Sequence, residues 1–328
     1  MISRSCPRAG RRERQMTENR FCLTEEYEGE RIDKVLVRLL EDTSRNYLKK
    51  LFADGSVQLN GKAVKPSARV KEGDEVWISI PDRVVPDILA EDIPLEVLYE
   101  DEDVLVVNKP KDMVVHPAAG HYSGTLVNAV MYRCRDQLSG INGVLRPGIV
   151  HRIDKDTTGS IIVCKNDASH NSIAAQLKDH TIVRKYYAIV YGRLKEDELV
   201  IDRPIGRDPK DRKKMAVRPD GKRAMTHIRV LERFRSYTYV ECRLETGRTH
   251  QIRVHMAYIG HPLLGDGVYQ GNRKCPFRTQ GQCLHAGILG FSHPRTGAYI
   301  ETSAPLPDYF TAILDTLRST DVYTSCTN

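Results

Sequence analysis

Apolar residues recur every three or four positions in two neighbouring segments near the start of the chain. The first segment predicts an amphipathic helix, with an inward face of Ile32, Val35, Leu36, Leu39 and Leu40. The second follows Thr43 or Ser44, either of which can cap a helix N-terminus, and turns Tyr47, Leu48, Leu51 and Phe52 inward. A strand over Val57–Leu59, the hairpin signal Asn60-Gly61 and a strand over Val76–Ile80 complete a small helix–helix–hairpin unit.

The pattern changes after the linker PDRVVPDILAEDIPLE, whose three prolines and several acids are typical of a semi-rigid domain boundary. Beyond it, runs rich in β-branched and aromatic residues predict strands over Asp103–Asn108, Ser160–Lys165, Tyr186–Tyr191, His227–Leu231 and Thr238–Leu244. Helical spacing predicts helices over Thr125–Tyr132, Ser169–Lys178, Thr249–Ile259 and Pro307–Leu317. Because strands and helices do not alternate strictly, we expect an α+β fold whose mixed, mainly antiparallel sheet is flanked by helices.

Four segments follow from this organisation. We expect a disordered basic arm at 1–20, a small domain at 21–85, a larger domain at 86–318 and a C-terminal tail at 319–328. The arm is rich in arginine and lacks the apolar stretch of a secretory signal, and Met16 is an alternative start.

Composition narrows the function classes. The net charge of +7 favours an acidic partner such as a nucleic acid, although charge alone leaves a mildly basic protein without one equally open. No apolar run approaches the length of a membrane span, so we expect no membrane partner. Eight cysteines without a CxxC pair match no common zinc spacing. Reduced thiols in a cytoplasmic protein are the simpler interpretation.

The segment HRIDKDTTG, residues 151–159, carries the candidate chemistry. Asp154, Asp156, Thr158 and Gly159 occupy positions 1, 3, 5 and 6 of a calcium loop, but position 12 is a lysine where calcium needs a bidentate glutamate. We therefore predict no metal here. Asp156 has the setting of a turn residue that hydrogen-bonds the backbone. Arg152 and Lys155 flank Asp154 and keep it ionised, so Asp154 could act as a nucleophile or a general base; spacing alone leaves a structural role open.

The segment HRIDKDTTG resembles the signature motif of the RluA/RluD-type pseudouridine synthases, whose invariant aspartate matches Asp154. Three further segments resemble that family in the same order: NKP with MVVHP at 108–117, RKY at 184–186, and LETGRTHQIRVH at 244–255. The first unit resembles the S4 RNA-binding domain over residues 29–82, through SRNYLKKLFADGSVQLNGKAV and VKEGDEVWI.

The resemblance implies roles for several residues. Asp154 would attack the nucleotide or abstract a ribose proton, and Arg253 would hold it ionised through charge-assisted hydrogen bonds. Tyr186 would stack on the uracil and could relay a proton; strand alternation turns the adjacent Tyr187 to the opposite face. The target nucleotide must leave its stack, and the planar guanidinium of Arg152 could fill the vacated space.

Other polar residues keep two interpretations each. His151 and His116 could contact phosphate, or could equally be structural histidines. His250 and His255 are five apart on the predicted helix and do not suggest zinc. In the S4-like unit, the resemblance implies that Arg45, Lys49, Lys50 and Lys65 face RNA phosphates. For each of them, a role as an ordinary solvated surface residue remains open.

The chain departs from the family pattern beside the predicted catalytic carboxylate. Asp112 stands where the first motif usually has glycine, Thr158 replaces serine, Ser160 an apolar residue and Cys164 an alanine. We expect these changes to affect local packing or substrate choice but not the reaction.

The resemblance implies an isomerase that converts uridines to pseudouridine in structured RNA, and large-subunit ribosomal RNA is the leading substrate. No GxGxxG or P-loop is present, and the reaction involves no redox step, so we expect no cofactor. We also expect a monomer. The alternatives are a transfer-RNA pseudouridine synthase, a non-catalytic S4-type RNA-binding or ribosome assembly factor, and a glycosidic hydrolase, which usually needs two carboxylates.

Overall fold

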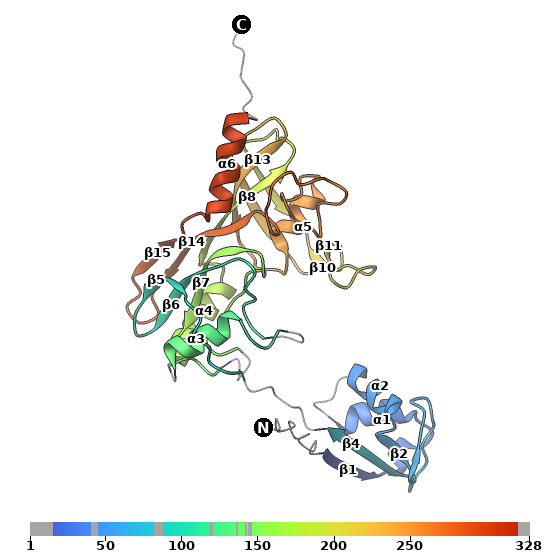
Figure 1. Cartoon of the computed structure of the whole chain (residues 1–328). Helices are drawn as coiled ribbons and strands as arrows, with labels where there is room; N and C mark the ends of the chain where they lie inside the picture. The colour runs from blue at the N-terminus through green and yellow to red at the C-terminus, as the bar shows by residue number, and fades with distance from the viewer. Residues whose placement is uncertain are drawn as a thin grey trace, which may run out of the picture. The chain divides into compact units, whose positions relative to one another are not determined.

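The computed structural model describes residues 16–40, 45–81, 88–117, 121–135, 137–141, 143 and 146–320. Contacts divide the chain into two compact units, residues 1–86 and 87–328 (Figure 1). None of the helices in the described ranges is long and apolar enough to cross a membrane.

In the N-terminal unit, two helices pack on a four-stranded antiparallel sheet of order β1-β4-β2-β3. The elements are β1 (Met16–Cys22), α1 (Ile32–Leu39), α2 (Arg45–Ala53), β2 (Val57–Leu59), β3 (Lys62–Ala63) and β4 (Glu75–Pro81), with a short 3-10 helix at Glu25–Tyr27. The predicted inward faces form the core, with Val35, Leu48 and Leu51 buried. At the predicted hairpin turn, Asn60 and Gly61 both have positive φ, of 50° and 76°, which explains the Asn-Gly pair.

The prediction of a disordered arm is wrong for its last residues. Met16–Cys22 forms β1, which pairs with β4 from Met16 opposite Pro81 to Cys22 opposite Glu75. The Arg20 guanidinium donates to the Glu75 carboxylate at 2.7 Å and lies 4.5 Å from the centre of the Trp77 ring. This polar strand is stabilised by pairing with a distant segment, which its local pattern does not reveal. Residues 1–15 and the predicted caps Thr43 and Ser44 lie outside the described residues.

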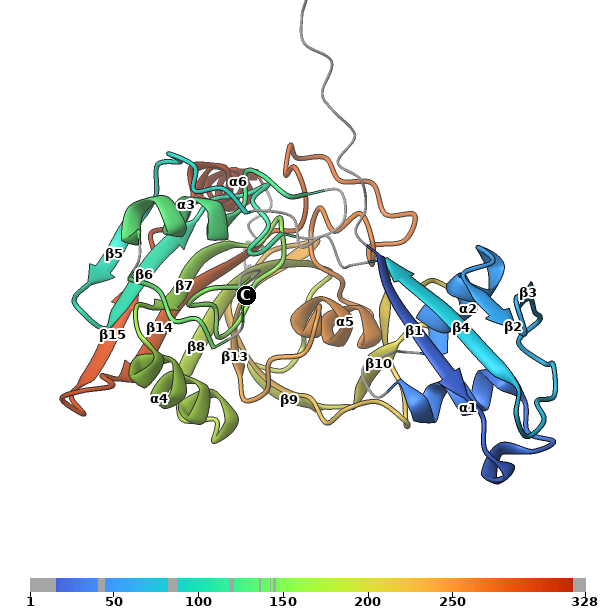
Figure 2. The same cartoon turned by 90° about the horizontal axis from the view of Figure 1, so that it is seen from below.

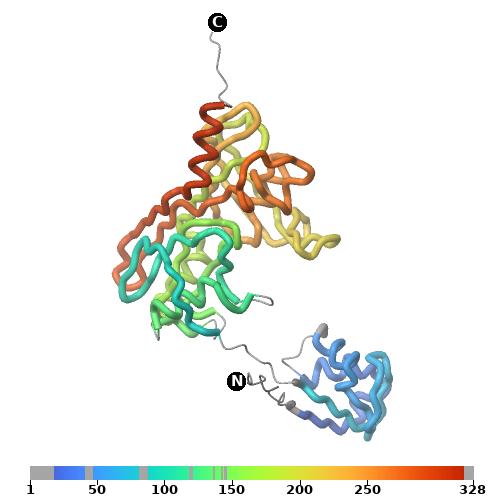
Figure 3. Tube along the Cα trace, in the orientation of Figure 1, coloured from blue at the N-terminus to red at the C-terminus, as the bar shows by residue number. Residues whose placement is uncertain are grey.

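The larger unit is built on one nine-stranded sheet of order β5-β6-β7-β14-β8-β13-β12-β9, with β15 paired to β14. Strand β7 pairs with β14 in parallel, and the other described pairs are antiparallel. Their bounds are β5 (Glu96–Glu100), β6 (Val104–Lys109), β7 (Thr158–Cys164), β8 (Val183–Tyr191), β9 (Glu198–Asp202), β12 (Met225–Arg233), β13 (Tyr237–Leu244), β14 (Leu284–Ser292) and β15 (Tyr299–Ser303). The C-terminal strands therefore lie beside strands from the start of this unit (Figure 3). The predicted α+β class is confirmed.

Helices cover both faces of this sheet, because its strands carry apolar residues on both sides. Helices α3 (Leu126–Cys134) and α5 (Gln251–Tyr258) pack on the face that carries Val107, Ile161 and Val240. Helix α4 (Asp167–Lys178) and helix α6 (Asp308–Thr320) pack on the other face. The sheet curves around α5 in Figure 2. A separate hairpin of β10 (Ile205–Arg207) and β11 (Met215–Val217) contacts α5.

Candidate active site

A cavity of about 590 Å³ opens on the α5 side of the sheet, between the loop that precedes β7, the strand β8 and the start of α5. The six residues that the motifs nominated in this unit all line it: His116, His151, Arg152, Asp154, Tyr186 and Arg253. Segments far apart in sequence thus bring their polar side chains to one hollow, which is where binding and catalytic sites usually lie.

Asp154 and Arg253 form an ion pair at this cavity. Nη1 of Arg253 donates to Oδ2 of Asp154 at 2.9 Å. The Arg253 side chain is 6% exposed and the Asp154 side chain is 17% exposed. Neighbouring Ile153 is buried in the core and anchors the loop. Because the guanidinium engages only Oδ2 through this bond, the second oxygen, Oδ1, remains available to a substrate.

A second carboxylate, Asp266, holds the other side of the Arg253 guanidinium, and sequence reasoning missed it. Nε and Nη2 of Arg253 donate to its two oxygens at 2.7 and 2.9 Å. Asp266 is fully buried and also accepts the backbone N–H groups of Val268 and Tyr269. Burial alone would lower the pKa of Arg253, but the two carboxylates raise it well above its ordinary value. The guanidinium is therefore fixed in position before any substrate arrives.

Tyr186 and Tyr187 point to opposite faces of β8, as alternation requires. Tyr186 is 7% exposed and lines the cavity, whereas the Tyr187 ring packs on the other face, 6.1 Å from the Tyr239 ring. Burial raises the pKa of Tyr186, and the Asp154 charge adds to that effect while Arg184 opposes it. Its hydroxyl is therefore protonated at neutral pH.

Arg184 is a second residue that sequence reasoning missed. It lies two positions before Tyr186, so the same alternation places it on the cavity side. It is 6% exposed, donates through Nη2 to the carbonyl of Glu245 at 2.9 Å, and its Nε is buried without a hydrogen-bond partner among the described residues. A Cβ on Gly247 would lie 2.8 Å from Nη1, so glycine there makes room for the guanidinium. Burial lowers the pKa of Arg184, and a buried cation without an acidic partner favours an anionic ligand.

The remaining cavity residues differ in how firmly hydrogen bonds to other residues hold their side chains. Arg152 is exposed and makes no hydrogen bond or ion pair within the described ranges. His151 accepts the backbone N–H of Ile162 through Nε2 at 3.1 Å and thereby braces the loop; burial lowers its pKa to about 3. His116 has a buried Nδ1 without a partner among the described atoms, and burial lowers its pKa to about 4. Both imidazoles are neutral at physiological pH.

Two contacts tie the first motif to the loop of Asp154. Lys109 is fully buried, and its Nζ donates to the carbonyls of Pro110, Met113 and Lys155 at 2.8–2.9 Å. Burial lowers its pKa to about 7 although Asp156 and Asp154 oppose the shift; the three carbonyls match the three N–H bonds of the charged form.

The second contact involves Asp112, the residue that replaces the family's usual glycine. It has a φ of 64°, a conformation that glycine adopts most easily and aspartate tolerates. Its exposed carboxylate accepts from Lys155 at 2.7 Å. The loop thus keeps a glycine-like bend and gains a negative charge. For Asp156, no side-chain hydrogen bond to the backbone is found within the described residues, contrary to the expected turn contact.

In the N-terminal unit, Lys49, Lys50 and Lys65 are exposed, whereas the Arg45 side chain lies outside the described residues. Lys49 lines a groove of about 720 Å³. The same groove holds three basic residues of the α1 region that the sequence reasoning did not nominate: Arg31, Lys34 and Arg38. Arg31 and Arg38 are paired with Asp33 and Glu30.

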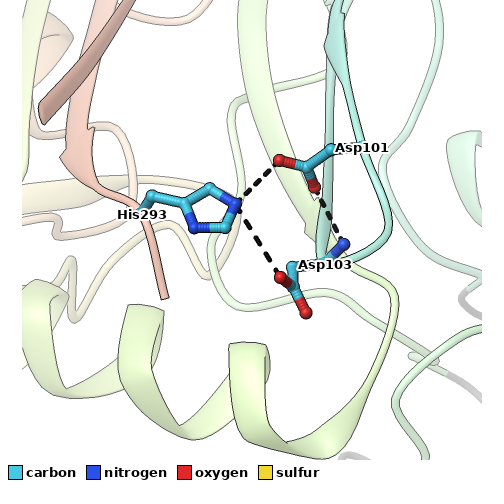
Figure 4. Close-up of side chains that lie close together, drawn as sticks. All are labelled: Asp101, Asp103 and His293. Atoms are coloured by element: carbon cyan, nitrogen blue, oxygen red, sulfur yellow. Dashed lines mark hydrogen bonds and ion pairs between the residues drawn. The ribbon is translucent and has the colours of Figure 1, made fainter. Parts of the chain in front are cut away.

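One cluster in the described part of the larger unit has the composition of a metal site: Asp101, Asp103 and His293 (Figure 4). Nδ1 of His293 accepts the N–H groups of Arg295 and Thr296 at 3.2 Å, so its proton resides on Nε2 and is donated to Asp101 at 2.7 Å. The nitrogen that would bind a metal is therefore a donor. The cluster joins the β5–β6 turn to the turn after β14 and needs no ion.

Comparisons with known proteins show which families the two units match. The family model described as RNA pseudouridylate synthase matches residues 103–258, and the S4 domain model matches residues 30–76. The chain is 55% identical over 295 residues to an uncharacterized RNA pseudouridine synthase, YlyB, of Bacillus subtilis (strain 168), covering 90% of this chain and 96% of that protein. It is 47% identical over 302 residues to the ribosomal large subunit pseudouridine synthase D of Zymomonas mobilis, covering 89% and 95% of the two chains.

Solved structures share the fold of the larger unit. Human RNA pseudouridylate synthase domain containing 4 aligns with a TM-score of 0.53 at 23% identity, covering 68% of this chain and 93% of that one. The human domain containing 1 protein gives a TM-score of 0.52 at 24% identity, covering 71% and 99%.

Proposed function

The chain belongs to the RNA pseudouridylate synthase family, and from this premise we propose that it converts uridines of large-subunit ribosomal RNA to pseudouridine with Asp154 as its catalytic carboxylate. The relatives of similar length that are named for the large ribosomal subunit support this substrate. The observation that carries the proposal is the chain of charges from partly exposed Asp154 to buried Arg253 and Asp266 at the edge of a nucleotide-sized cavity.

The reaction is an isomerisation that needs no outside reactant. The bond between ribose C1′ and uracil N1 breaks, the base rotates, C1′ bonds to C5, and the proton lost from C5 balances the proton gained at N1. Asp154 lines the cavity, and Arg253 holds its Oδ2 but not its Oδ1, so Oδ1 can act as nucleophile toward the nucleotide or as base toward the ribose. Fixing the carboxylate in advance lowers the cost of reaching the reactive geometry.

The other cavity residues suit a nucleotide turned out of its stack. The Tyr186 ring offers an apolar face for the uracil, and exposed Arg152 can enter the space that the base leaves. Arg184 supplies a buried positive charge for the backbone of the flipped nucleotide. The S4 unit adds a second basic surface through Lys49, Lys50 and Lys65, which favours a large structured RNA over an isolated transfer-RNA arm.

Three further expectations belong to this proposal: the enzyme acts as a monomer, works in the cytoplasm and requires no cofactor. Activity on a purified transcript that persists in EDTA would agree with the expectation that no metal is required.

The proposal is tested with ribosomal RNA transcribed without modifications. We would incubate it with the wild type, with Asp154→Asn and with Asp156→Asn, digest it to nucleosides and quantify pseudouridine by mass spectrometry. Asp156 is the matched control, because it carries the same charge two residues away and does not line the cavity. We expect product from the wild type and Asp156→Asn, and none from Asp154→Asn despite unchanged RNA binding.

Each alternative gives a different result. Product from transfer-RNA transcripts alone would identify a transfer-RNA synthase. RNA binding without product on either substrate would identify a binding or assembly factor, and free uracil among the products would identify a hydrolase.

A further inference from the structure

His250, the residue before α5, lies beside the predicted catalytic carboxylate. It lines the cavity, its side chain is 19% exposed, and its Nε2 lies 3.9 Å from Oδ1 of Asp154. That distance is too long for a hydrogen bond. Oδ1 is also the oxygen that Arg253 does not engage. Nε2 and Oδ1 thus lie close to each other on two residues that line the cavity, without a direct hydrogen bond between them.

The hydrogen bonds around Tyr269 decide which ring nitrogen of His250 carries the proton. The Tyr269 hydroxyl lies 2.8 Å from Nδ1 of His250 and accepts the backbone N–H of Met215 at 2.9 Å. A phenol has one hydrogen to donate, and the acceptor in reach among the described residues is Nδ1. The opposite tautomer would leave that hydroxyl hydrogen without a partner among the described residues, which loses a hydrogen bond. The neutral imidazole therefore carries its hydrogen on Nε2, the nitrogen that lies 3.9 Å from Oδ1 of Asp154.

The surrounding structure holds this arrangement in place. His250 has the left-handed backbone angles φ 56° and ψ 23°, which are uncommon for a residue other than glycine and concentrate at functional sites. Its ring packs edge-on against Tyr269, with centroids 5.7 Å apart. The backbone N–H of Tyr269 is bound by Asp266. Asp266 thus orients both Arg253, which binds Asp154, and Tyr269, which binds His250.

Burial favours the neutral form of His250 by lowering its pKa. Asp154 and Asp266 oppose that shift, while Arg253 and Arg152 reinforce it. Burial also raises the pKa of Tyr269 to about 12, so the hydroxyl retains the hydrogen that it donates to Nδ1. At neutral pH the cavity therefore receives an N–H donor from His250 and a carboxylate oxygen from Asp154.

We propose that His250 is a further catalytic residue, whose Nε2–H donates a hydrogen bond to a uracil carbonyl oxygen, and that Tyr269 is the positioning residue that fixes its tautomer. This inference rests on the proposed function. When the C1′–N1 bond breaks, its electron pair stays with the uracil, and the negative charge spreads from N1 to the carbonyl oxygens. A fixed donor aimed at that oxygen stabilises the departing base. No proton is transferred, so the step balances without another reactant.

The test compares three variants in single-turnover reactions on unmodified ribosomal RNA. His250→Gly removes the donor while relieving the left-handed backbone, His250→Gln keeps an N–H donor, and Tyr269→Phe keeps the ring but removes the hydroxyl. We expect His250→Gly to lower the single-turnover rate by roughly 10²-fold with the RNA dissociation constant unchanged within about threefold. His250→Gln should recover at least tenfold, and Tyr269→Phe should be slowed by about tenfold.

A purely structural role predicts a different order, because glycine would be the best tolerated residue at this left-handed position. Full activity in His250→Gly overturns the inference, as does an equal loss in His250→Gly and His250→Gln. If the wild type itself makes no pseudouridine, the proposed function fails instead.

A second readout does not depend on turnover. In protein with ¹⁵N-labelled histidine, assigned through His250→Gln, the wild type should show a protonated Nε2 and an unprotonated Nδ1, and Tyr269→Phe should lose that preference. A protonated Nδ1 in the wild type would contradict the inference.

Discussion

At the residue scale, the cavity depends on a single guanidinium shared by two carboxylates. Arg253 is 5% exposed, and Asp266 occupies two of its hydrogen-bonding nitrogens while Asp154 occupies the third. Arginine suits this position because its planar fork binds a carboxylate through two parallel bonds. Asp266 is therefore the main partner of the Arg253 charge. Asp154, the carboxylate proposed to react, keeps one oxygen free of Arg253.

Asp266→Asn should reduce both stability and activity, because it leaves the buried Arg253 with one charged partner. Breaking a buried pair of this kind costs about 3 kcal/mol in free energy of unfolding, and we expect pseudouridine formation to slow by at least tenfold. Urea unfolding and single-turnover kinetics measure the two effects. Asp315→Asn is the control, since Asp315 forms an exposed pair with Arg318 and should change stability by less than about 1 kcal/mol. Equal behaviour of the two variants would contradict the assignment of Asp266.

Ser160→Ala should stabilise the protein. The Ser160 hydroxyl is buried in β7 without a hydrogen-bond partner among the described residues, and an unsatisfied buried polar group costs about 1–3 kcal/mol. We expect Tm to rise by about 2–4 °C for each kcal/mol regained, with activity unchanged.

The control for this change lies two positions away on the same strand. Thr158 has a hydroxyl 2.8 Å from Nδ1 of His285, so Thr158→Ala should lower Tm. A lower Tm for Ser160→Ala would mean that its hydroxyl has a partner after all.

Motifs and strand alternation predicted part of this site. They nominated Asp154, Arg253 and Tyr186, which line one cavity, and the same alternation applied to β8 could have found Arg184. Asp266 and Tyr269 carried no such signal, because their roles come from contacts with α5 and with the β10–β11 hairpin. His250 was considered only as a metal ligand, since the tautomer that defines its role depends on a distant hydroxyl.

At the element scale, long periodic segments were predictable, whereas most short paired strands were not, apart from β2 beside its Asn-Gly turn. All four helices predicted in the larger unit exist within about two residues of their expected ends, apart from a longer α6. The missed strands include β9, β10 and β11, which have three to five residues each. Such strands are specified by their partners rather than by their own alternation. The continuous apolar run of β14 cannot be distinguished from a buried helix by periodicity.

Strand β1 allows a direct test at this scale. Deleting residues 1–22 removes β1, whose seven residues pair with β4, and so exposes the edge of β4. We therefore expect the N-terminal unit to unfold at a lower urea concentration. Deleting residues 1–15 should leave the midpoint unchanged, because that cut preserves β1. Trp77 is the single tryptophan of the chain and lies on β4, so its fluorescence reports on this unit alone. Identical midpoints for the two truncations would show that β1 contributes nothing to the unit.

At the scale of the whole molecule, the chain consists of two compact units, and a hollow in each is lined by basic side chains. The order of the units was predictable because each resembles a known family, and the S4 and synthase models match separate parts of the chain. The basic residues that line the groove of the N-terminal unit were only partly predictable. Lys34 of α1 lines it together with Lys49 of α2, and of these two helices the sequence pointed only to α2.

The N-terminal unit should strengthen RNA binding mainly through counterion release. Each phosphate neutralised on single-stranded RNA contributes about 0.7 to the slope of log affinity against log salt concentration. The triple variant Lys49→Ala, Lys50→Ala, Lys65→Ala should therefore flatten that slope by about 2 if all three side chains contact phosphates. Filter binding across a salt series measures the slope, and Lys195→Ala, an exposed lysine of the larger unit, is the control.

The same series with residues 87–328 alone, a unit with its own core, should give a still smaller slope with the sheet and cavity retained. If this shorter protein binds as tightly and with the same slope as the full chain, the phosphate contacts reside in the larger unit, and the basic groove of the N-terminal unit must act on something other than affinity.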